Sequence, residues 1–385
     1  MILTPLLFKQ TRSQKLKVWV LSPAIQSADD NIDYYYDFTQ SIAEYTKVFA
    51  ELKINWQWQP VTMATFRQVI ENIEAEKQGN NVPVVLNLCD GDEVNGTPGV
   101  SVVKLLEEKD IIHTGADEYF YNITTSKIPM KIAFDEAGVA NAAWKCILDK
   151  ETNCNNIFKE LGKPLIIKPA VSGGSMGVGI KNIVETRKEL YALLKQMFEG
   201  YRGWNLTADG IIAEKFISGR EFTVLITGSC NDPEHAVVYT PVERVFHASL
   251  PDKEKFLSFD RLWEIYEEES AMPGEENFYE YQVPLDTELV EAIKKLSWDA
   301  YCATKGKGYT RVDIRMDEKT KKLYVLEVNA QCGISEDENY TSIGAIIRFD
   351  GKSFSQLIIE ILNDAFTRSS KKDVQKKKET RRKIA

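Results

Sequence analysis

Apolar residues form two short, nearly continuous runs near the start of the chain, at 17–21 (KVWVL) and 83–88 (PVVLNL). Runs of this length are typical of strands that are covered on both faces. Elsewhere in this part, apolar residues recur every three or four positions, which predicts helices over 39–52, 63–77 and 100–108. Strands that alternate with helices predict βαβ units and a parallel sheet.

The rest of the chain has a mixed pattern. A helix is predicted over 126–138, closed by Gly138, which suits the left-handed position that follows a helix. The strand predicted over 164–170 runs into the segment 172–179, which holds four glycines in eight residues. Further elements are predicted as strands over 210–217, 221–227, 309–317 and 323–333 and a helix over 353–366. We therefore expect an α/β part followed by α+β parts.

The composition is that of an ordinary globular protein. Of the 385 residues, 43% are hydrophobic and 27% are charged, and the length suits two or three domains. No stretch approaches the roughly 18–20 consecutive apolar residues that cross a bilayer. The opening MILTPLLF lacks the length and the cleavage pattern of a signal peptide. We expect a soluble, cytoplasmic protein with no membrane span.

The net charge of −9 is unevenly distributed. Residues 368–385 hold nine basic and two acidic residues, so the rest of the chain stands near −16. An acidic body argues against a core that binds nucleic acid. The basic segment is expected to be a disordered, solvated tail, with contact to RNA, DNA or an anionic membrane as the alternative.

The cysteines do not form a recognisable site. They are scattered, with no CxxC pair and no neighbouring histidine cluster, which favours reduced, mostly buried thiols over disulfides or a zinc site. The six are Cys89, Cys146, Cys154, Cys230, Cys302 and Cys332.

Lys168 ends a predicted strand directly before the glycine-rich segment 172–179. Glycines let backbone N–H groups approach an anion closely, and a lysine supplies a point charge for phosphate oxygens. The segment matches neither GxGxxG nor the P-loop spacing. A phosphate-binding turn and a plain loop both remain open. The missing GxGxxG after KVWVL also disfavours an NAD-dependent dehydrogenase.

Four polar residues lie in the two apolar strands 309–317 and 323–333. Arg311 and Asp313 are spaced i, i+2, and so are Glu327 and Asn329, so each pair shares one face of its strand. In a hairpin these groups can converge. Asp, Glu and Asn oxygens are the ligands that Mg²⁺ prefers. A metal site is favoured over a polar outer face with surface ion pairs, because charges in an apolar strand need a partner.

Three motifs occur in a fixed order: KPAVSGGSMGVGI, EKFISGREFTV and RVDIRMD…LYVLEVN…G. With TSK–MKIAF–AGV upstream and GKSFSQLIIEIL downstream, the set resembles the ATP-grasp ligases and, among them, the D-alanine–D-alanine ligases, over roughly 84–366. The resemblance implies an N-terminal parallel-sheet α/β domain and two α+β lobes that clasp ATP. The expected divisions are 1–115, 116–213, 214–367 and the tail 368–385.

The resemblance also implies residue roles. Lys127 and Lys168 would bind ATP phosphates under the closing segment 172–179, and Glu221 would hold the ribose. The implied nucleotide-binding residues are Lys127, Lys168, Ser172, Gly173, Gly174, Ser175, Met176, Glu214, Lys215, Phe216, Ile217 and Glu221. The implied ligands of Mg²⁺, or of Mn²⁺, are Asp313, Glu327 and Asn329. Arg311 would stabilise a tetrahedral intermediate, and Ser175 is counted with it as catalytic.

The implied reaction is ADP-forming: a carboxylate is converted to an acyl phosphate, which an amine then attacks. The basic residue that meets the phosphates from 240–260 stays open among Arg244, His247, Lys253 and Lys255. The substrates would be a small carboxylate and a small amine, contacted by Glu93, Gly333 and Ser335. A homodimer is compatible with the sequence.

The substrate segments depart from the family pattern. The first loop reads LSPAIQSADDNIDYYYD, the second, NLCDGDEVNGTPG, lacks a histidine, and Glu336, Asp337 and Glu338 follow Ser335. We therefore expect another amino acid or small metabolite as substrate. Authentic D-alanine–D-alanine ligation and a nucleotide-binding regulator without turnover remain the alternatives.

Overall fold

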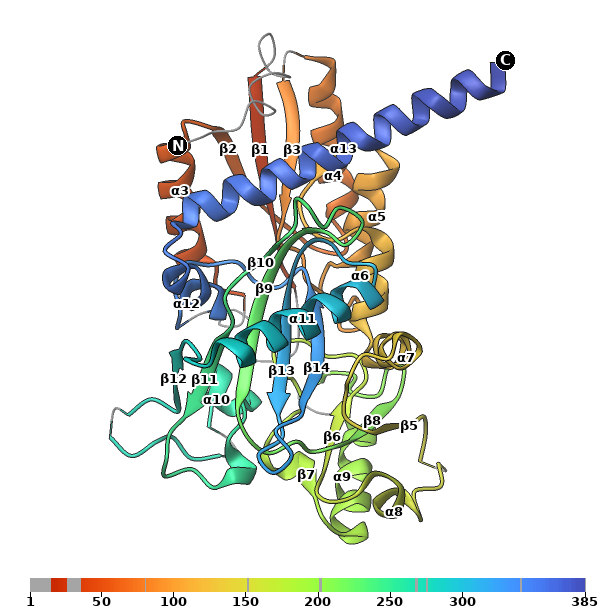
Figure 1. Ribbon diagram of the computed structural model, residues 1–385. Helices are drawn as coiled ribbons and strands as arrows, with labels where there is room; N and C mark the ends of the chain where they lie inside the picture. Colours follow the sequence, from red (N-terminus) through yellow and green to blue (C-terminus); the bar gives the residue numbers. More distant parts are fainter. Residues whose placement is uncertain are drawn as a thin grey trace.

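Three sheets follow one another along the long axis of the molecule (Figure 1). This computed structural model describes residues 15–25, 36–79, 81–150, 152–200, 203–266, 269–274, 276–339 and 341–384. The tyrosine-rich part of the first loop, at 26–35, and the opening apolar segment lie outside the described residues.

The N-terminal sheet is parallel, as the sequence predicts, with the order β2-β1-β3-β4. Apolar side chains cover both of its faces: Trp19 and Val85 pack toward α4 and α5, whereas Val18 and Val84 pack toward α3 and α13. The elements are β1 (Lys15–Pro23), α3 (Thr39–Leu52), β2 (Asn55–Val61), α4 (Phe66–Ala75), β3 (Asn81–Asn87), α5 (Val100–Glu108) and β4 (Ile112–His113). The edge strand β2 was not predicted, because its polar residues alternate with tryptophans that are only half-buried.

The second sheet is antiparallel, with the order β5-β8-β6-β7, and the helices α8 and α9 pack against it. We call this unit the small lobe. Its elements are β5 (Trp144–Ile147), α8 (Ile157–Leu161), β6 (Leu165–Pro169), β7 (Ile183–Val184), α9 (Arg187–Glu199) and β8 (Ile211–Lys215). Because β8 continues to Lys215, this sheet ends two residues beyond the division expected at 213/214.

The third sheet, which we call the large lobe, has the order β12-β11-β9-β13-β14, with β10 paired to β9. The helices α6, α7 and α11 pack on one face, and α12 and α13 lie toward the N-terminal domain. The predicted hairpin is confirmed as β13 and β14. The elements are α6 (Glu118–Thr125), α7 (Lys127–Ala137), β9 (Glu221–Ser229), β10 (Val237–Val238), β11 (Val242–Phe246), α10 (Phe259–Trp263), β12 (Tyr279–Gln282), α11 (Thr287–Ala303), β13 (Lys307–Met316), β14 (Leu323–Ala330) and α12 (Ser342–Phe349).

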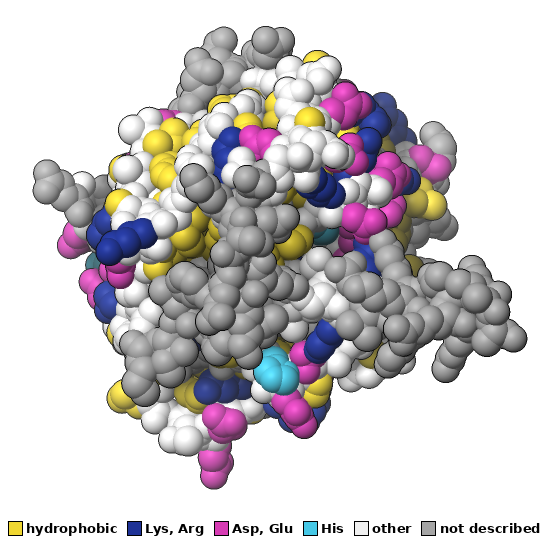
Figure 2. Space-filling view, turned by 90° about the horizontal axis from the view of Figure 1, so that it is seen from above, with side chains coloured by type: hydrophobic (Ala, Val, Ile, Leu, Met, Phe, Trp, Pro, Cys, Tyr) yellow, Lys and Arg dark blue, Asp and Glu magenta, His cyan; other side chains and the backbone are white. Residues whose placement is uncertain are grey.

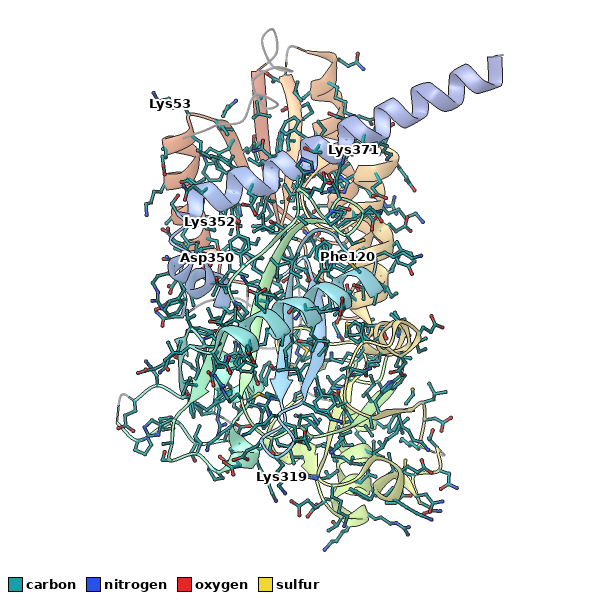
Figure 3. The ribbon with its side chains drawn as sticks, in the orientation of Figure 1. Lys53, Phe120, Lys319, Asp350, Lys352 and Lys371 are labelled. Atoms are coloured by element: carbon teal, nitrogen blue, oxygen red, sulfur yellow. The ribbon has the colours of Figure 1, made fainter. Side chains whose placement is uncertain are left out.

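The basic tail differs from the expectation of disorder, because it continues the last helix, α13 (Phe354–Ile384), which projects from the body (Figure 1). Arg368 donates to the carbonyls of His113 and Gly115 at 3.2 and 3.0 Å. Lys371, which Figure 3 labels on the same helix, pairs with Asp232 at 2.5 Å. These contacts hold the helix against the body beyond residue 366, where its apolar part ends. Figure 2, which views the molecule from above, shows basic and acidic side chains intermixed.

None of the helices in the described residues is long and apolar enough to cross a membrane. The six cysteines are free thiols, as predicted: Cys89, Cys154 and Cys332 are buried, and the other three are half-buried.

Candidate active site

A buried charge cluster lies between two strands of the small lobe and the helix α7 of the large lobe. Glu214, on β8, accepts from Lys131 of α7 at 2.6 Å and from Lys168 of β6 at 3.1 Å. The side chains of Lys131 and Glu214 are 1% and 2% exposed, whereas that of Lys168 is 16% exposed. Burial raises the pKa of Glu214, but the two ammonium groups outweigh it and lower the pKa. Glu214 is therefore held as a carboxylate, and Lys168 keeps an open side.

Lys127 adds a second cation at the first residue of α7. It is buried, and its ammonium donates to the carbonyl and hydroxyl oxygens of Ser172, both at 3.3 Å. Burial lowers the pKa of Lys127; the charge of Glu327 opposes this effect, Lys168 adds to it, and the pKa stays lowered. A buried ammonium with long hydrogen bonds to neutral oxygens is poorly compensated. Lys127 and the start of the glycine-rich segment therefore face a place that favours an anion.

The glycine-rich segment 172–179 turns through two left-handed glycines, Gly174 and Gly177, with φ of 52° and 70°. Asn182 fixes this segment through two hydrogen bonds. Its amide nitrogen donates to the carbonyl of Gly177 at 2.8 Å, and its amide oxygen accepts from the N–H of Gly179 at 2.8 Å. The turn is thus supported on the side of the small-lobe sheet.

Three residues of the large lobe, Leu257, Trp263 and Glu269, contact the same segment and the residue that follows it. The Ser175 hydroxyl donates to the carbonyl of Leu257 at 3.0 Å, and the Trp263 indole donates to that of Gly174 at 2.9 Å. The buried carboxylate of Glu269 accepts from the N–H of Ile180 at 2.9 Å. The glycine-rich segment therefore lies between the small-lobe sheet and a strap from the large lobe.

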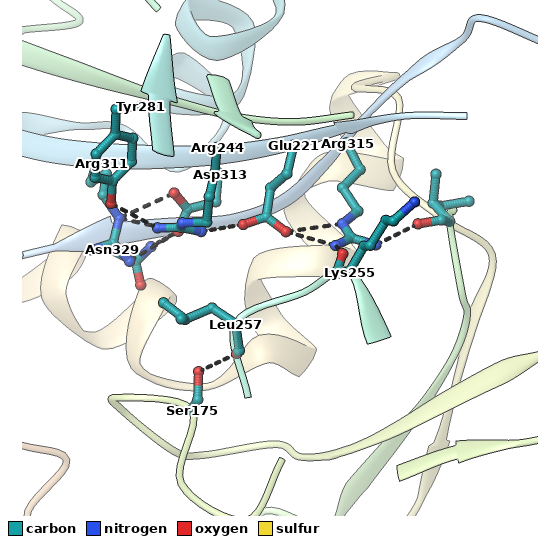
Figure 4. A network of polar contacts seen from close by, with 11 residues as sticks. Ser175, Glu221, Arg244, Lys255, Leu257, Tyr281, Arg311, Asp313, Arg315 and Asn329 are labelled. Atoms are coloured by element: carbon teal, nitrogen blue, oxygen red, sulfur yellow. Dashed lines mark hydrogen bonds and ion pairs between the residues drawn. The ribbon is translucent and has the colours of Figure 1, made fainter. Parts of the chain in front are cut away.

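The hairpin of the large lobe places the second set of polar groups. Asp313 lies opposite Glu327, and Arg311 lies opposite Asn329. The Arg311 guanidinium donates to Asp313 at 2.9 and 3.1 Å, and the Asn329 amide donates to the same carboxylate at 3.0 Å (Figure 4). Burial lowers the pKa of Arg311, but the Asp313 charge outweighs it and raises the pKa. The four groups converge on one patch.

This patch offers two carboxylates and one amide to a cation. Among the described residues, no group of three or more His, Cys, Asp and Glu side chains is placed to hold a metal ion. The oxygens of Asp313, Glu327 and Asn329 nevertheless lie on one face of the hairpin, and such hard oxygen donors fit Mg²⁺. The guanidinium of Arg311 already supplies positive charge to Asp313.

Glu221, at the first position of β9, lies between two arginines (Figure 4). Arg315 donates to it from Nε and Nη2 at 3.0 and 2.8 Å, and Arg244 donates from Nη1. Burial raises the pKa of Glu221, but the two guanidinium groups lower it. After Glu214, a second buried carboxylate of the site is thus kept charged.

Charges from both lobes act on the carboxyl group of Glu327, which lies on β14. Burial raises the pKa of this carboxyl, but Lys127, Lys168 and Arg311, with a hydrogen bond from Asn329, lower it. Lys168 belongs to the small lobe, whereas Lys127, on α7, and Arg311, on the hairpin, belong to the large lobe. Cations from α7, β6 and β13 therefore act on one carboxylate of β14.

A family model described as the D-ala D-ala ligase C-terminus matches residues 133–363. This chain belongs to the D-alanine–D-alanine ligase family. The D-alanine–D-alanine ligase of Borrelia garinii is 27% identical over 219 residues, which cover 57% of this chain and 53% of the relative. The chain thus spans about half the length of that ligase. The ligase of a Thermoanaerobacter species is 26% identical over 302 residues, covering 77% of this chain and 75% of the relative.

Solved structures agree on the fold. D-alanine–D-alanine ligase from Bacillus anthracis, complexed with ATP, has a TM-score of 0.63 at 20% identity, covering 93% of this chain and 99% of that chain. The ligase from Coxiella burnetii has a TM-score of 0.65 at 14% identity, covering 97% and 100%. The ATP-grasp fold expected from the motifs is confirmed.

The residues expected to contact substrates lie outside these charge clusters. Glu93 caps the start of α5, where it accepts from the N–H of Gly99 and from the N–H and hydroxyl of Ser101, at 2.6–3.2 Å. Ser335 is fully buried and donates to Glu44 of α3 at 2.7 Å. Gly333 lies in the loop after β14. Glu93 and Ser335 thus make structural contacts in this family member.

The acidic residues after Ser335 are largely paired. Glu336 forms an ion pair with Lys47 at 3.0 Å, and Glu338 forms one with Arg348 at 2.7 Å. Asp337 accepts from the N–H of Asn339 at 2.9 Å. The cations reduce the repulsion that this segment would exert on a substrate carboxylate.

The four basic candidates in 240–260 have different surroundings. Arg244 is buried beside Glu221, whereas Lys255 pairs with Asp252 at 2.8 Å. Lys253 pairs with Glu185, and the His247 ring lies 3.6 Å from Glu276. Of the four, Arg244 contacts Glu221 through its side chain, and Lys255 contacts the site through its carbonyl, which accepts from Arg315.

Sequence reasoning missed Lys131 and Arg315 as members of the site. Lys131 follows Lys127 by four residues, so helical spacing places both on one face of α7. Arg315 follows Asp313 by two residues on β13, which is the same spacing that drew attention to Arg311. Both spacings were visible in the motifs. The neighbouring sequence, however, did not indicate that Lys131 binds Glu214 or that Arg315 binds Glu221.

Proposed function

We propose that this protein is an ATP-dependent carboxylate–amine ligase of the D-alanine–D-alanine ligase type. The observation that carries the proposal is the convergence of Arg311, Asp313 and Asn329 on one patch of the hairpin. The cations Lys127 and Lys168 lower the pKa of Glu327 on the same hairpin. Phosphoryl transfer needs cations around a polyanion and carboxylates that hold a divalent metal. Family membership and the ATP-grasp fold support the same conclusion.

The nucleotide is assigned to the space between the lobes. Lys127, Lys168 and the backbone of 172–179 face the phosphates, and residues 214–217 with Glu221 hold the nucleoside. The poorly compensated ammonium of Lys127 and the open side of Lys168 support the phosphate assignment. Lys131 anchors Glu214, which leaves Lys168 free to turn toward a phosphate.

Asp313, Glu327 and Asn329 are the proposed ligands of Mg²⁺, which would neutralise phosphate charge when bound. Their placement on one face of the hairpin supports this assignment. The Asp313 carboxylate would then bind the metal ion while it still accepts from the Arg311 guanidinium. We expect Arg311 then to face the substrate with part of its guanidinium free.

The proposed chemistry has two steps. An oxygen of the donor carboxylate attacks the γ-phosphorus of ATP, forming an acyl phosphate and releasing ADP. The amine of the acceptor attacks the acyl carbon, a tetrahedral oxyanion forms next to Arg311, and phosphate leaves as the amine gives up a proton. The glycine-rich segment and its strap exclude water, which would otherwise hydrolyse the acyl phosphate.

The proposed substrates are a small amino acid or metabolite with a carboxylate and a second small molecule with an amine. Authentic ligation of two D-alanines is the second candidate. It is favoured by the ion pairs of Glu336 and Glu338, which offset the acidic charge near the acceptor segment. Against it stand the structural contacts of Glu93 and Ser335.

A nucleotide-binding regulator without turnover is the alternative from another class. A protein that only binds ATP has no need of a guanidinium beside the metal carboxylates. The contact between Arg311 and Asp313 supports a ligase over a regulator.

The deciding experiment measures ADP release by the purified full chain, with ATP and Mg²⁺, across D- and L-amino acids and small amines, singly and in pairs. We expect release that requires one defined pair. An Asp313→Asn variant should remove it, and Glu318→Gln, an exposed carboxylate on the same hairpin, should not. ATP binding without ADP release for any pair would favour the regulator.

A further inference from the structure

The carboxylate of Glu221 has nearly exhausted its capacity to accept hydrogen bonds. A carboxylate offers about four acceptor positions, two on each oxygen. Arg315 fills both positions of Oε2, with Nε at 3.0 Å and Nη2 at 2.8 Å. Arg244 fills one position of Oε1 through Nη1. One acceptor position remains, on Oε1.

Both arginines are fixed by further contacts (Figure 4). The Arg315 side chain is 3% exposed, and it also donates to the carbonyls of Ile217, at 2.8 Å, and Lys255. Arg244 donates to the Tyr281 hydroxyl at 3.2 Å, and its guanidinium lies 5.0 Å from the Tyr279 ring centroid. Neither guanidinium can leave Glu221 without giving up buried contacts.

We infer that Arg315 makes Glu221 a receptor for a single ribose hydroxyl, so that Arg315 determines how the protein discriminates between nucleotide sugars. The inference rests on the proposed nucleotide site. Without Arg315, both oxygens of Glu221 could accept from the two hydroxyls of a ribose. With Arg315 in place, only Oε1 has a position free, and one of the two hydroxyls must find its partner elsewhere or in water.

The test is calorimetric binding of ATP, 2′-deoxy-ATP and 3′-deoxy-ATP to the full chain in Mg²⁺. A hydrogen bond to a charged group is strong, so removal of the recognised hydroxyl should weaken binding about tenfold or more. Removal of the other hydroxyl should weaken it by less than about threefold. Equal losses for both analogues, or no loss for either, would overturn the inference while leaving the proposed function intact. Failure to bind ATP at all would instead defeat the proposed function.

Arg315→Met tests the assignment to this residue. The variant frees Oε2, so the affinities for the two deoxy analogues should come within about twofold of each other. A purely structural role would weaken all three nucleotides equally and preserve the ratio found in the wild type, which would overturn the assignment. Arg220→Met is the matched control, because Arg220 neighbours Glu221 in sequence but pairs with Glu243 at 2.5 Å; it should keep the ratio.

Arg315→Lys covers the case in which the methionine variant does not fold. Lysine keeps the charge but cannot fill both positions of Oε2 from a guanidinium fork. The ratio between the two analogues should then fall between the wild-type value and one. A ratio unchanged in a folded lysine variant would also overturn the assignment.

Discussion

The proposed nucleotide end of the site, around Lys127, Lys168 and Glu221, and the proposed substrate end, around Glu93 and Ser335, use charged residues in different ways. At the nucleotide end, cations and carboxylates are set against each other across strands, and Lys127 and Lys168 keep capacity for an anion. At the substrate end, Glu93 caps a helix and Ser335 ties the loop after β14 to α3. The first set is arranged around a space, and the second is used in holding domains together.

The difference follows from the elements that carry each set. Strand register fixes Asp313 opposite Glu327 and Ile166 opposite Glu214, so the nucleotide end is built on rigid sheets. The substrate end is built on loops, whose polar groups satisfy nearby backbone and domain contacts. The polar groups on strands are therefore held by register, whereas those on loops depend on the contacts that each loop makes.

The largest effect is expected from the hairpin carboxylates. Asp313→Asn or Glu327→Gln should reduce turnover at least about a hundredfold, because the phosphate charge loses its compensation. The fold should persist, since the backbone pairing of the hairpin is unaffected. Steady-state ADP release and a thermal melt measure the two quantities. Turnover within about threefold of wild type in either variant would contradict the metal assignment.

A smaller effect is expected at Lys168. Lys168→Ala should weaken ATP binding about tenfold or more, the loss of a charge-assisted hydrogen bond of roughly 1.5–3 kcal/mol. Calorimetry measures the affinity, with the exposed Lys163→Ala as control. Unchanged affinity would show that Lys168 serves only to hold Glu214.

The nucleotide end should also set the response to acid. The folded protein lowers the pKa values of Glu214 and Glu221, so it binds fewer protons than the unfolded chain near their ordinary value of about 4.3. Their stabilisation is fully present above that value and is lost as the pH falls through the lower folded values. Denaturant titrations from pH 6 to pH 3 should show this decline, and Glu221→Gln should make it shallower. An identical decline in the variant would contradict the prediction.

The substrate end should respond weakly to loss of its acidic charge. The triple variant Glu336→Gln, Asp337→Asn and Glu338→Gln should change kcat/KM for an acceptor amino acid by less than about threefold, because Lys47 and Arg348 already offset two of the charges. Comparison of D-alanine with neutral and basic amines measures the effect. A gain of tenfold or more for D-alanine alone would show that these acids face the acceptor.

The tail should affect neither end. Removal of residues 373–385 should leave the steady-state constants unchanged, whereas truncation after Phe366 should lower the melting temperature, because it also removes the contacts of Arg368 and Lys371. Activity assays and thermal melts of both truncations provide the comparison. A loss of activity from the shorter deletion would show that the tail reaches the site.

Much of the fold was accessible from local pattern. The continuous apolar runs at 17–21 and 83–88 predicted a parallel sheet covered on both faces, and the motifs predicted the ATP-grasp lobes. The i, i+2 spacing placed Arg311 with Asp313 before their contact was seen. The half-buried edge strand β2 was not predicted, because its alternation of tryptophan with polar residues resembles that of an exposed segment.

The sequence by itself determined the long apolar strands, such as β1, β3, β13 and β14, and the chemical groups that stand on them, because apolar runs and side-chain period are local properties. Only the tertiary structure decided that Glu214 binds Lys131, 83 residues away, that Glu221 binds Arg315, 94 residues away, and that Ser335 binds Glu44, 291 residues away. Such pairs depend on sheet register and domain packing, and many other acids and bases in the chain could have formed them. The proposed reaction depends on polar groups that strand register places, whereas the proposed substrate depends on loop residues that domain packing places.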